Sequence, residues 1–126
     1  MSEKEKTILI VDDELEISEL FSEMLTLSGF QVRSSHHYQQ AIEAINSSPP
    51  DGILLDVMMP EISGLEVLHF VRTHPKYRDI PVIIVSSKGF PVDIEAYENA
   101  GANHYLTKPV SFPDLTKAVQ NALQMK

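Results

Sequence analysis

Cysteine is absent from this 126-residue chain. Without a thiol, the chain can form neither a disulfide framework nor a thiolate zinc site, and it has no cysteine nucleophile. Long apolar runs are also missing, because none approaches the roughly 20 residues that a membrane helix needs. The first residues, MSEKEK, are charged and are followed by no apolar signal segment, so no signal peptide is predicted. We therefore expect a cytoplasmic protein without a membrane-bound part.

Basic residues are few. Ten Lys and Arg stand against eighteen Asp and Glu, which gives a formal net charge of −8. Nucleic-acid binding takes most of its affinity from phosphate contacts made by clustered Lys and Arg. The basic residues here are scattered, so direct binding of nucleic acid by this domain is disfavoured. Part of the acidic excess could instead form a cation site.

The length fits one domain over residues 1–126, with a core at about 7–124. Apolar runs at Thr7–Val11, 53–55 and 82–85 are almost unbroken, which is typical of strands buried on both faces of a parallel sheet. Two more polar runs, at 31–34 and 103–107, predict edge strands.

Helical spacing of apolar residues separates these runs. The predicted helix boundaries are a stop at Gly29, a helix over 38–46, a capping box at Ser63 and Glu66, a helix from Pro91 to near Gly101, and a cap at Ser111. The predicted core faces are Ile17, Leu20, Phe21, Met24 and Leu27; Ala41, Ile42 and Ile45; Leu65, Leu68 and Val71; and Phe112, Leu115, Val119 and Ala122.

Five β-α repeats predict an α/β fold, a five-stranded parallel sheet surrounded by five helices. The first, third and fourth strands are the most apolar and should be central. This gives the order 2-1-3-4-5 of flavodoxin-like folds. In such sheets, ligands bind outside the carboxyl ends of the strands where the strand order reverses, here between the first and third strands.

Polar residues follow the strands at that edge. Asp12 and Asp13 come after the first strand, Asp56 ends the third, Ser86 ends the fourth and Lys108 follows the fifth. Clustered carboxylates repel one another, and a hard cation such as Mg²⁺ would compensate them through oxygen ligands. A nearby lysine suits a second anion, so the set indicates metal-assisted phosphoryl transfer with a carboxylate as nucleophile. Taken singly, Asp13 could be a helix cap, Lys108 a surface charge and Ser86 a turn residue.

Four segments together resemble the receiver domains of response regulators in two-component signalling. They are ILIVDDE at 8–14, PDGILLDVMMPEISGLEVL at 50–68, PVIIVSS at 81–87 and GANHYLTKP at 101–109. The resemblance extends from Ile8 to about Leu123 and implies a CheY-like fold. It implies a phosphorylatable switch rather than an enzyme, with self-catalysed phosphorylation and dephosphorylation only.

The resemblance assigns roles by position. Asp56 would accept a phosphoryl group from a sensor histidine kinase or a histidine phosphotransfer protein. Asp13, Asp56 and the backbone carbonyl of Met58 would bind Mg²⁺ directly, while Asp12 would hold a coordinated water. Lys108 would pair with the phosphoryl oxygens.

Further roles concern the switch. Ser86 would donate a hydrogen bond to the phosphoryl group, and Tyr105 would turn inward when Ser86 moves. The Lys108–Pro109 peptide bond is expected to be cis. A downstream protein would then read the changed face, with Tyr97 and Tyr105 as candidate contacts, and phosphorylation could drive homodimer formation. The sequence fits a stand-alone regulator and a receiver cut from a longer protein equally well.

Two other functions are alternatives. A metal-dependent phosphatase with an Asp nucleophile would want a second Asp two residues after the first, and Met58 stands there. A phosphorylation-independent interaction module would not need the acidic pair, Ser86 and Lys108. We also hypothesise that the apolar Met58 makes hydrolysis of the acyl phosphate slow. The five histidines lack ligand spacing and are interpreted as surface or loop residues.

Overall fold

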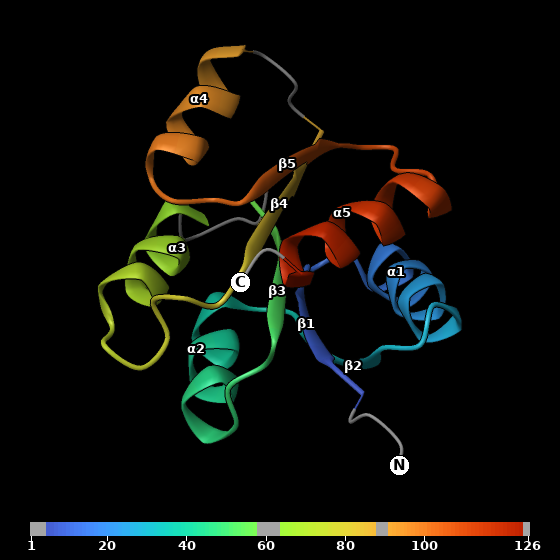
Figure 1. Cartoon of the computed structure of the whole chain (residues 1–126), viewed down its shortest axis with the longest axis horizontal. Helices are drawn as coiled ribbons and strands as arrows, with labels where there is room; N and C mark the ends of the chain where they lie inside the picture. The colour runs from blue at the N-terminus through green and yellow to red at the C-terminus, as the bar shows by residue number, and fades with distance from the viewer. Residues whose placement is uncertain (1–4, 58–63, 88–90, 125–126) are drawn as a thin grey trace.

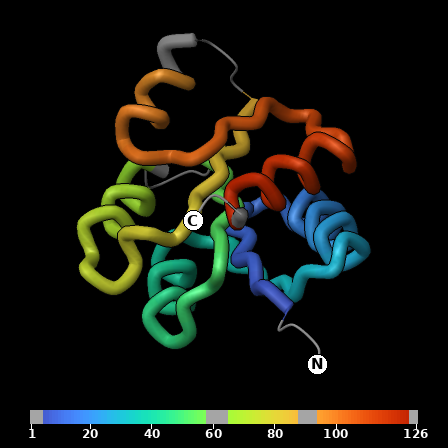
Figure 2. Tube along the Cα trace, viewed as in Figure 1, coloured from blue at the N-terminus to red at the C-terminus, as the bar shows by residue number. Residues whose placement is uncertain are grey.

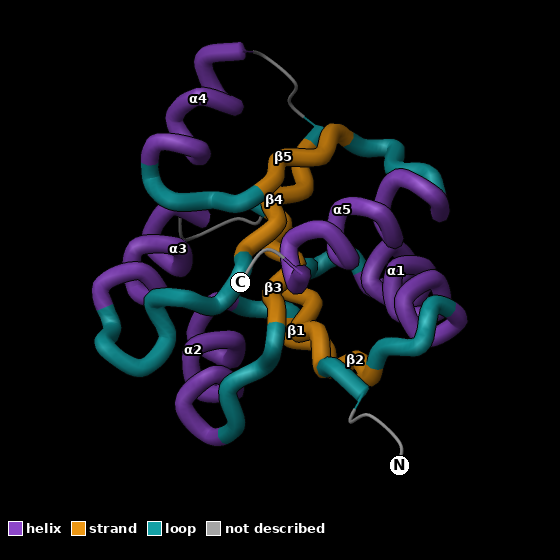
Figure 3. The backbone as a smooth tube through the Cα atoms, in the orientation of Figure 1, coloured by secondary structure: helices purple, strands orange, loops and turns teal. Residues whose placement is uncertain are grey.

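The computed structural model describes residues 5–57, 64–87 and 91–124. Its five strands are β1 (Thr7–Val11), β2 (Gln31–Ser35), β3 (Gly52–Asp56), β4 (Val82–Ser86) and β5 (His104–Thr107). They form one parallel sheet in the order β2-β1-β3-β4-β5, as predicted. The sheet runs through the middle of the molecule (Figure 3), and Figure 2 shows the last strand beside β4.

Five helices alternate with the strands, which confirms the predicted β-α repeat. They are α1 (Leu15–Leu27), α2 (Tyr38–Ser47), α3 (Gly64–Thr73), α4 (Pro91–Asn99) and α5 (Phe112–Gln124). Helices α1 and α5 cover one face of the sheet, and α2, α3 and α4 cover the other (Figure 1). Within the described residues, no helix has the length and apolar character needed to span a membrane.

The central strands are buried because apolar residues line both of their faces. Ile8 and Ile10 of β1 pack toward α1 and α5, whereas Leu9 and Val11 pack toward α2 and α3. Every residue of β3 and β4 is buried. Unbroken apolar runs therefore belong to the strands that have neighbours on both sides, and the more polar β2 and β5 form the edges.

The buried face of α1 is only partly the predicted one, because Phe21 is buried and Ile17 and Met24 pack against the core as predicted, but two leucines do not. Leu20 and Leu27 are 45% and 79% exposed, while Ser18, Phe21 and Leu25 are buried. The predicted face included Leu20 and Leu27, but the helix is rotated so that Ser18 and Leu25 face the sheet in their place. Leu65 and Phe112, also predicted to face the core, are 37% and 42% exposed and lie in the first turns of α3 and α5.

Arg72 joins the end of α3 to two loops. Its Nε donates to the carbonyl oxygen of Gly101 at 2.9 Å, and one terminal nitrogen donates to that of Ile80 at 2.7 Å. The other terminal nitrogen donates to Oδ1 of Asn103 at 2.8 Å. These bonds tie α3 to the segment before β4 and to the α4–β5 loop, at the sheet edge opposite the carboxyl ends of the strands.

Candidate functional site

The acidic pair lies directly after β1. The backbone N–H of Asp12 donates to the carbonyl oxygen of Ser35 on β2 at 3.0 Å, which extends the β1–β2 pairing by one residue. The Asp12 carboxylate accepts a 2.9 Å hydrogen bond from the backbone N–H of Glu14, and its residue is only 1% exposed. The corner that carries the acidic pair is thus fixed from two sides.

Asp56 brings a third carboxylate to the same place. It is the last residue of β3, which pairs with β1, and it is 3% exposed. Carboxylate oxygens of Asp12, Asp13 and Asp56 all lie within 4.8 Å of one another. In the part of the chain that the structure describes, this is the only cluster of three or more His, Asp or Glu side chains placed to share one ion.

Lys108, the first residue after β5, completes the cluster. Its Nζ lies 3.5 Å from Oδ2 of Asp56, 3.4 Å from Oδ2 of Asp12 and 3.0 Å from Oε1 of Glu14. The side chain is only 15% exposed, so it is not an ordinary surface charge. Its backbone N–H donates to the carbonyl oxygen of Ser86 at 2.7 Å, and the Lys108–Pro109 peptide bond is cis.

The electrostatics of the cluster show that its negative charge is only partly compensated. The pKa of Asp12 is raised to about 6, chiefly by burial and also by the nearby Asp56, against the opposing effects of the Glu14 N–H and of Lys108. Burial by itself would lower the pKa of Lys108. The hydrogen bond to Glu14 and the charges of Asp56 and Asp12 outweigh burial, so the Lys108 pKa is raised.

A pocket opens onto this cluster. Its volume is about 430 Å³, and it is lined by Asp13, Glu14, Ile17, Asp56, Ser87 and Lys108. The buried carboxylate of Asp56 is therefore reachable from outside. The arrangement offers a nucleophilic oxygen, two further carboxylates and an ammonium group around one cavity.

The remaining predicted residues lie near the cluster but not in it. Ser86 ends β4 and is fully buried, one residue beyond Val85, the register partner of Asp56. Tyr105 of β5 is half-buried on the other face of the sheet, with its ring centroid 5.9 Å from that of Tyr97 on α4. Met58 lies outside the described residues.

The alternative role for Asp13, a cap of the first helix, is wrong. Glu14, not Asp13, is the N-cap residue of α1, and no side chain caps that helix. Asp13 is therefore free of the helix-capping role and contributes its carboxylate to the cluster instead.

Sequence reasoning missed three residues around the site. Glu14 holds Lys108 in place, and a third acid directly after the Asp pair was the available signal. His36 lies in the loop between β2 and α2, in agreement with the prediction for the histidines, but no role was predicted for it; it is half-buried and its Nδ1 lies 3.0 Å from the carbonyl oxygen of Asp12. Tyr38 donates to the carbonyl oxygen of Asp56 at 3.0 Å, a contact between distant segments that no local pattern reveals.

Comparison with known proteins decides which family has this geometry. A family model described as the response regulator receiver domain matches residues 8–120. The chain belongs to this family. It is therefore a receiver domain of the kind found in two-component systems, as its sequence segments indicated.

The relatives of this receiver domain are regulators. It is 30% identical to the polar-differentiation response regulator DivK of Brucella anthropi, over 94% of this chain and 96% of DivK. It is 34% identical to the phosphate regulon transcriptional regulatory protein PhoB of Klebsiella pneumoniae, over 94% of this chain but 52% of PhoB. The chemotaxis protein CheY4 of Vibrio cholerae has a similar structure, with a TM-score of 0.89 and 26% identity over 94% of this chain and 99% of CheY4.

Proposed function

We propose that this receiver domain is a phosphorylation switch in which Asp56 accepts a phosphoryl group with the help of Mg²⁺. The donor is a phosphohistidine of a sensor histidine kinase or of a histidine phosphotransfer protein. The phosphorylated domain then presents a changed surface to a downstream protein. The observation that carries the proposal is the position of Asp56, which is buried at the end of β3 yet lines the pocket opposite the Lys108 ammonium.

The residues present fit a magnesium ion. All three clustered side chains offer carboxylate oxygens, which are the ligands that Mg²⁺ prefers. The raised pKa of Asp12 indicates negative charge that a cation would stabilise. Asp13 and Asp56 would bind the ion directly and Asp12 through a water, and the Met58 carbonyl stays a prediction. When bound, the ion would neutralise charge on the transferring phosphoryl group.

The transfer itself needs few groups. A carboxylate oxygen of Asp56 attacks phosphorus and forms an acyl phosphate, while the P–N bond to the donor imidazole breaks and the nitrogen keeps the electron pair. Lys108 is held in the ionised form by its neighbours and stands 3.5 Å from Asp56, where it can pair with phosphoryl oxygens. The chain therefore contributes positioning and charge, which suffice for phosphoryl transfer.

A switch follows from the new charge. An acyl phosphate adds close to two negative charges and three acceptor oxygens at the pocket. Lys108 gains a partner that competes with Glu14, and the Ser86 hydroxyl can donate to a phosphoryl oxygen. Because the backbones of Ser86 and Lys108 are bonded at 2.7 Å, movement at the end of β4 is passed to β5, which carries Tyr105 beside Tyr97 of α4. This difference in interactions is what can shift the population between two arrangements.

Intact-mass spectrometry after incubation with acetyl phosphate and Mg²⁺ tests the proposal. The unmodified sequence should gain one phosphoryl group, and Asp56→Asn should gain none. Asp114→Asn, which changes an exposed carboxylate on α5, is the matched control and should be modified normally. Equal modification of Asp56→Asn would contradict the choice of acceptor.

Two further outcomes separate the rival functions. Steady release of phosphate from phosphate esters would support a phosphatase, because the proposed switch takes its phosphoryl group from phosphohistidine or an acyl phosphate and not from esters. Failure to bind Mg²⁺ or beryllofluoride would support an interaction module that does not use phosphorylation.

A further inference from the structure

The β2–α2 junction, residues 35–38, makes three hydrogen bonds to the strands that carry the acidic residues. Ser35 provides the carbonyl that accepts from the Asp12 N–H at 3.0 Å. His36 and Tyr38 then reach two different carbonyl oxygens with their side chains, at 3.0 Å each. One short segment at the end of the edge strand thus contacts both Asp12, directly after β1, and Asp56, the last residue of β3.

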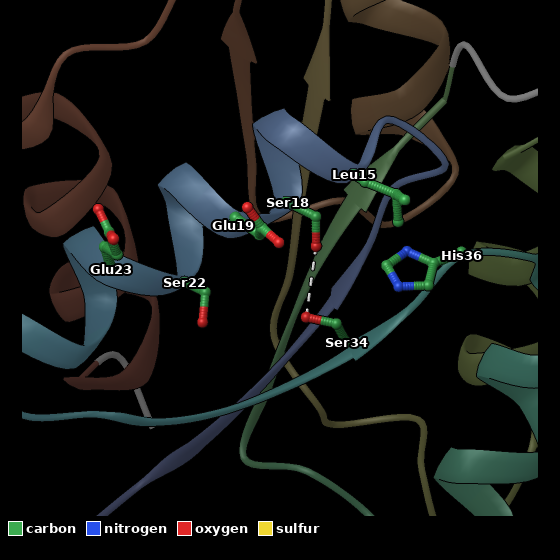
Figure 4. Close-up of a pocket in the computed structure, with 7 residues that line it drawn as sticks. All are labelled: Leu15, Ser18, Glu19, Ser22, Glu23, Ser34 and His36. Atoms are coloured by element: carbon green, nitrogen blue, oxygen red, sulfur yellow. Dashed lines mark hydrogen bonds between the residues drawn. The ribbon is translucent and has the colours of Figure 1, made fainter.

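His36 holds the backbone of the acidic pair. The carbonyl oxygen of Asp12 can only accept, so Nδ1 of His36 is the donor in this contact. The backbone N–H of His36 itself donates to Oε1 of Gln40 on α2 at 2.9 Å, which fixes the histidine backbone. The imidazole lies at the end of a groove between α1 and β2, near Leu15 and Ser34 (Figure 4).

Tyr38 holds the backbone of the proposed phosphoacceptor. It is the first residue of α2, is 3% exposed, and packs in the core between α2, α3 and the sheet. Its hydroxyl donates to the carbonyl oxygen of Asp56. Asp56 ends its strand, so this bond fixes the peptide plane from which the chain leaves β3.

These bonds act where the sheet ladder ends. Both Asp12 and Asp56 stand at the carboxyl ends of their strands, where side-chain donors take over from strand pairing. The backbone fixes the direction of the Cα–Cβ bond and so limits where the carboxylate can lie, and small displacements of a reacting group cost rate. Neither His36 nor Tyr38 belongs to the residues that line the pocket.

From this geometry we infer that His36 and Tyr38 are positioning residues of the phosphoacceptor site. His36 orients the acidic pair for the cation, and Tyr38 orients Asp56 for attack on phosphorus. The inference rests on the proposed function, because it assigns a role in phosphorylation of Asp56. It adds two residues that act through the backbone and do not contact the phosphoryl group.

Tyr38→Phe tests the second role, with Tyr77→Phe as its matched control. Tyr77 is also buried and its hydroxyl also donates one hydrogen bond, at 2.7 Å to Oδ1 of Asn46, far from the site. Rates of Asp56 phosphorylation are measured with acetyl phosphate at saturating Mg²⁺. We expect Tyr38→Phe to slow the reaction by about threefold to tenfold, the effect of one hydrogen bond, and Tyr77→Phe to leave it unchanged.

His36→Ala tests the first role. The Mg²⁺ concentration that gives half-maximal phosphorylation should rise by about threefold to tenfold. His36→Asn, whose amide N–H can replace the Nδ1 donor, should restore it to within about twofold. His37→Ala removes the neighbouring exposed imidazole, whose side chain makes no cap bond, and should leave the Mg²⁺ dependence unchanged.

The outcomes are separable. Equal rates for Tyr38→Phe and Tyr77→Phe, or equal Mg²⁺ dependence for His36→Ala and His37→Ala, would overturn the positioning role of the residue concerned. Loss of both readouts in proportion to a fall in melting temperature, without rescue by His36→Asn, would show a structural role only and overturn it as well. Absence of phosphorylation in the unmodified sequence would instead overturn the proposed function, and this inference with it.

Discussion

The Nζ of Lys108 lies 3.5 Å from Oδ2 of Asp56, and the two groups belong to segments at opposite ends of the β3–β4–β5 half of the sheet. The same ammonium is 3.4 Å from Asp12. A single cation therefore faces two buried carboxylates, and its third partner, Glu14, is largely exposed. This balance of charge leads to the first two predictions.

Replacing Lys108 by an uncharged residue should destabilise the protein most at neutral pH. Lys108→Met leaves the Asp12 and Asp56 carboxylates without their ammonium partner. We expect the free energy of unfolding at pH 7 to fall by about 1–3 kcal/mol, less than for a fully buried pair because Lys108 is partly solvated. At about pH 5 the loss should shrink, because Asp12 is then largely protonated. Urea denaturation at both pH values measures this loss, with Lys117→Met at an exposed position of α5 as the control.

Asp12 should make stability without Mg²⁺ decline as pH rises. The pKa of Asp12 is raised from 3.8 to about 6 in the folded protein, so folding favours the protonated carboxyl. Its contribution is complete below about pH 4 and is lost between about pH 4 and pH 6, amounting to up to about 3 kcal/mol. Added Mg²⁺ should stabilise the protein at pH 7, where Asp12 is ionised, and less at pH 5.

Urea denaturation across this pH range, with and without Mg²⁺, checks the sign. Asp12→Asn should remove the contribution of Asp12 to the slope of stability against pH. Asp114→Asn, at an exposed position of α5, should keep that contribution. A slope that is the same in Asp12→Asn as in the unmodified sequence would show that other groups cause it.

Substitutions at two glycines can distinguish the cost of backbone strain from the cost of a steric clash. Gly101 and Gly29 have φ of +108° and +98°, which side chains rarely adopt. A Cβ on Gly101 would lie 2.9 Å from Nε of Arg72, whereas one on Gly29 would meet nothing within 4 Å. Gly29→Ala should thus cost about 1–2 kcal/mol of stability from strain alone.

Gly101→Ala should cost more, about 2–4 kcal/mol, because Arg72 must also leave its carbonyl partners. Thermal and urea denaturation of both variants measures the difference. Equal losses would mean that Arg72 adapts to the new methyl group without losing hydrogen bonds.

Two leucines of α1 provide a further test, which concerns the face of the helix that packs on the sheet. Leu25 is fully buried against the sheet and Leu27 is 79% exposed. Leu25→Ala should lower the free energy of unfolding by about 2–5 kcal/mol, since it removes core contacts and leaves a cavity. Leu27→Ala should change it by no more than about 0.5 kcal/mol. Comparable losses would restore the face that was predicted from the leucine spacing.

The strand order could be predicted because the apolar content of each strand's own sequence indicates whether that strand is central or at an edge of the sheet. The runs at Thr7–Val11 and Val82–Ser86 are apolar at nearly every position, and only a strand with neighbours on both sides and helices on both faces tolerates this. Once the order is known, the carboxyl ends of the strands must share one edge. The meeting of Asp12, Asp56 and Lys108 then follows from topology.

The rotation of α1 could not be predicted in the same way. Leucines occur at several angles around this helix, and the buried Ser18 donates a hydrogen bond to the hydroxyl of Ser34 on β2 at 3.3 Å. Hydrophobic spacing gives no weight to such a pair. The roles of His36 and Tyr38 are equally invisible, since each depends on the distance between a side chain and a carbonyl from another strand.

The contact between Asp12 and Lys108 spans 96 residues. During synthesis the acidic pair leaves the ribosome early, whereas its ammonium partner arrives only with the final strand. A nascent or truncated chain that ends before Lys108 contains the acidic pair but lacks the ammonium group that faces Asp12 and Asp56. On the proposed function, we expect such incomplete chains to be poor phosphoacceptors.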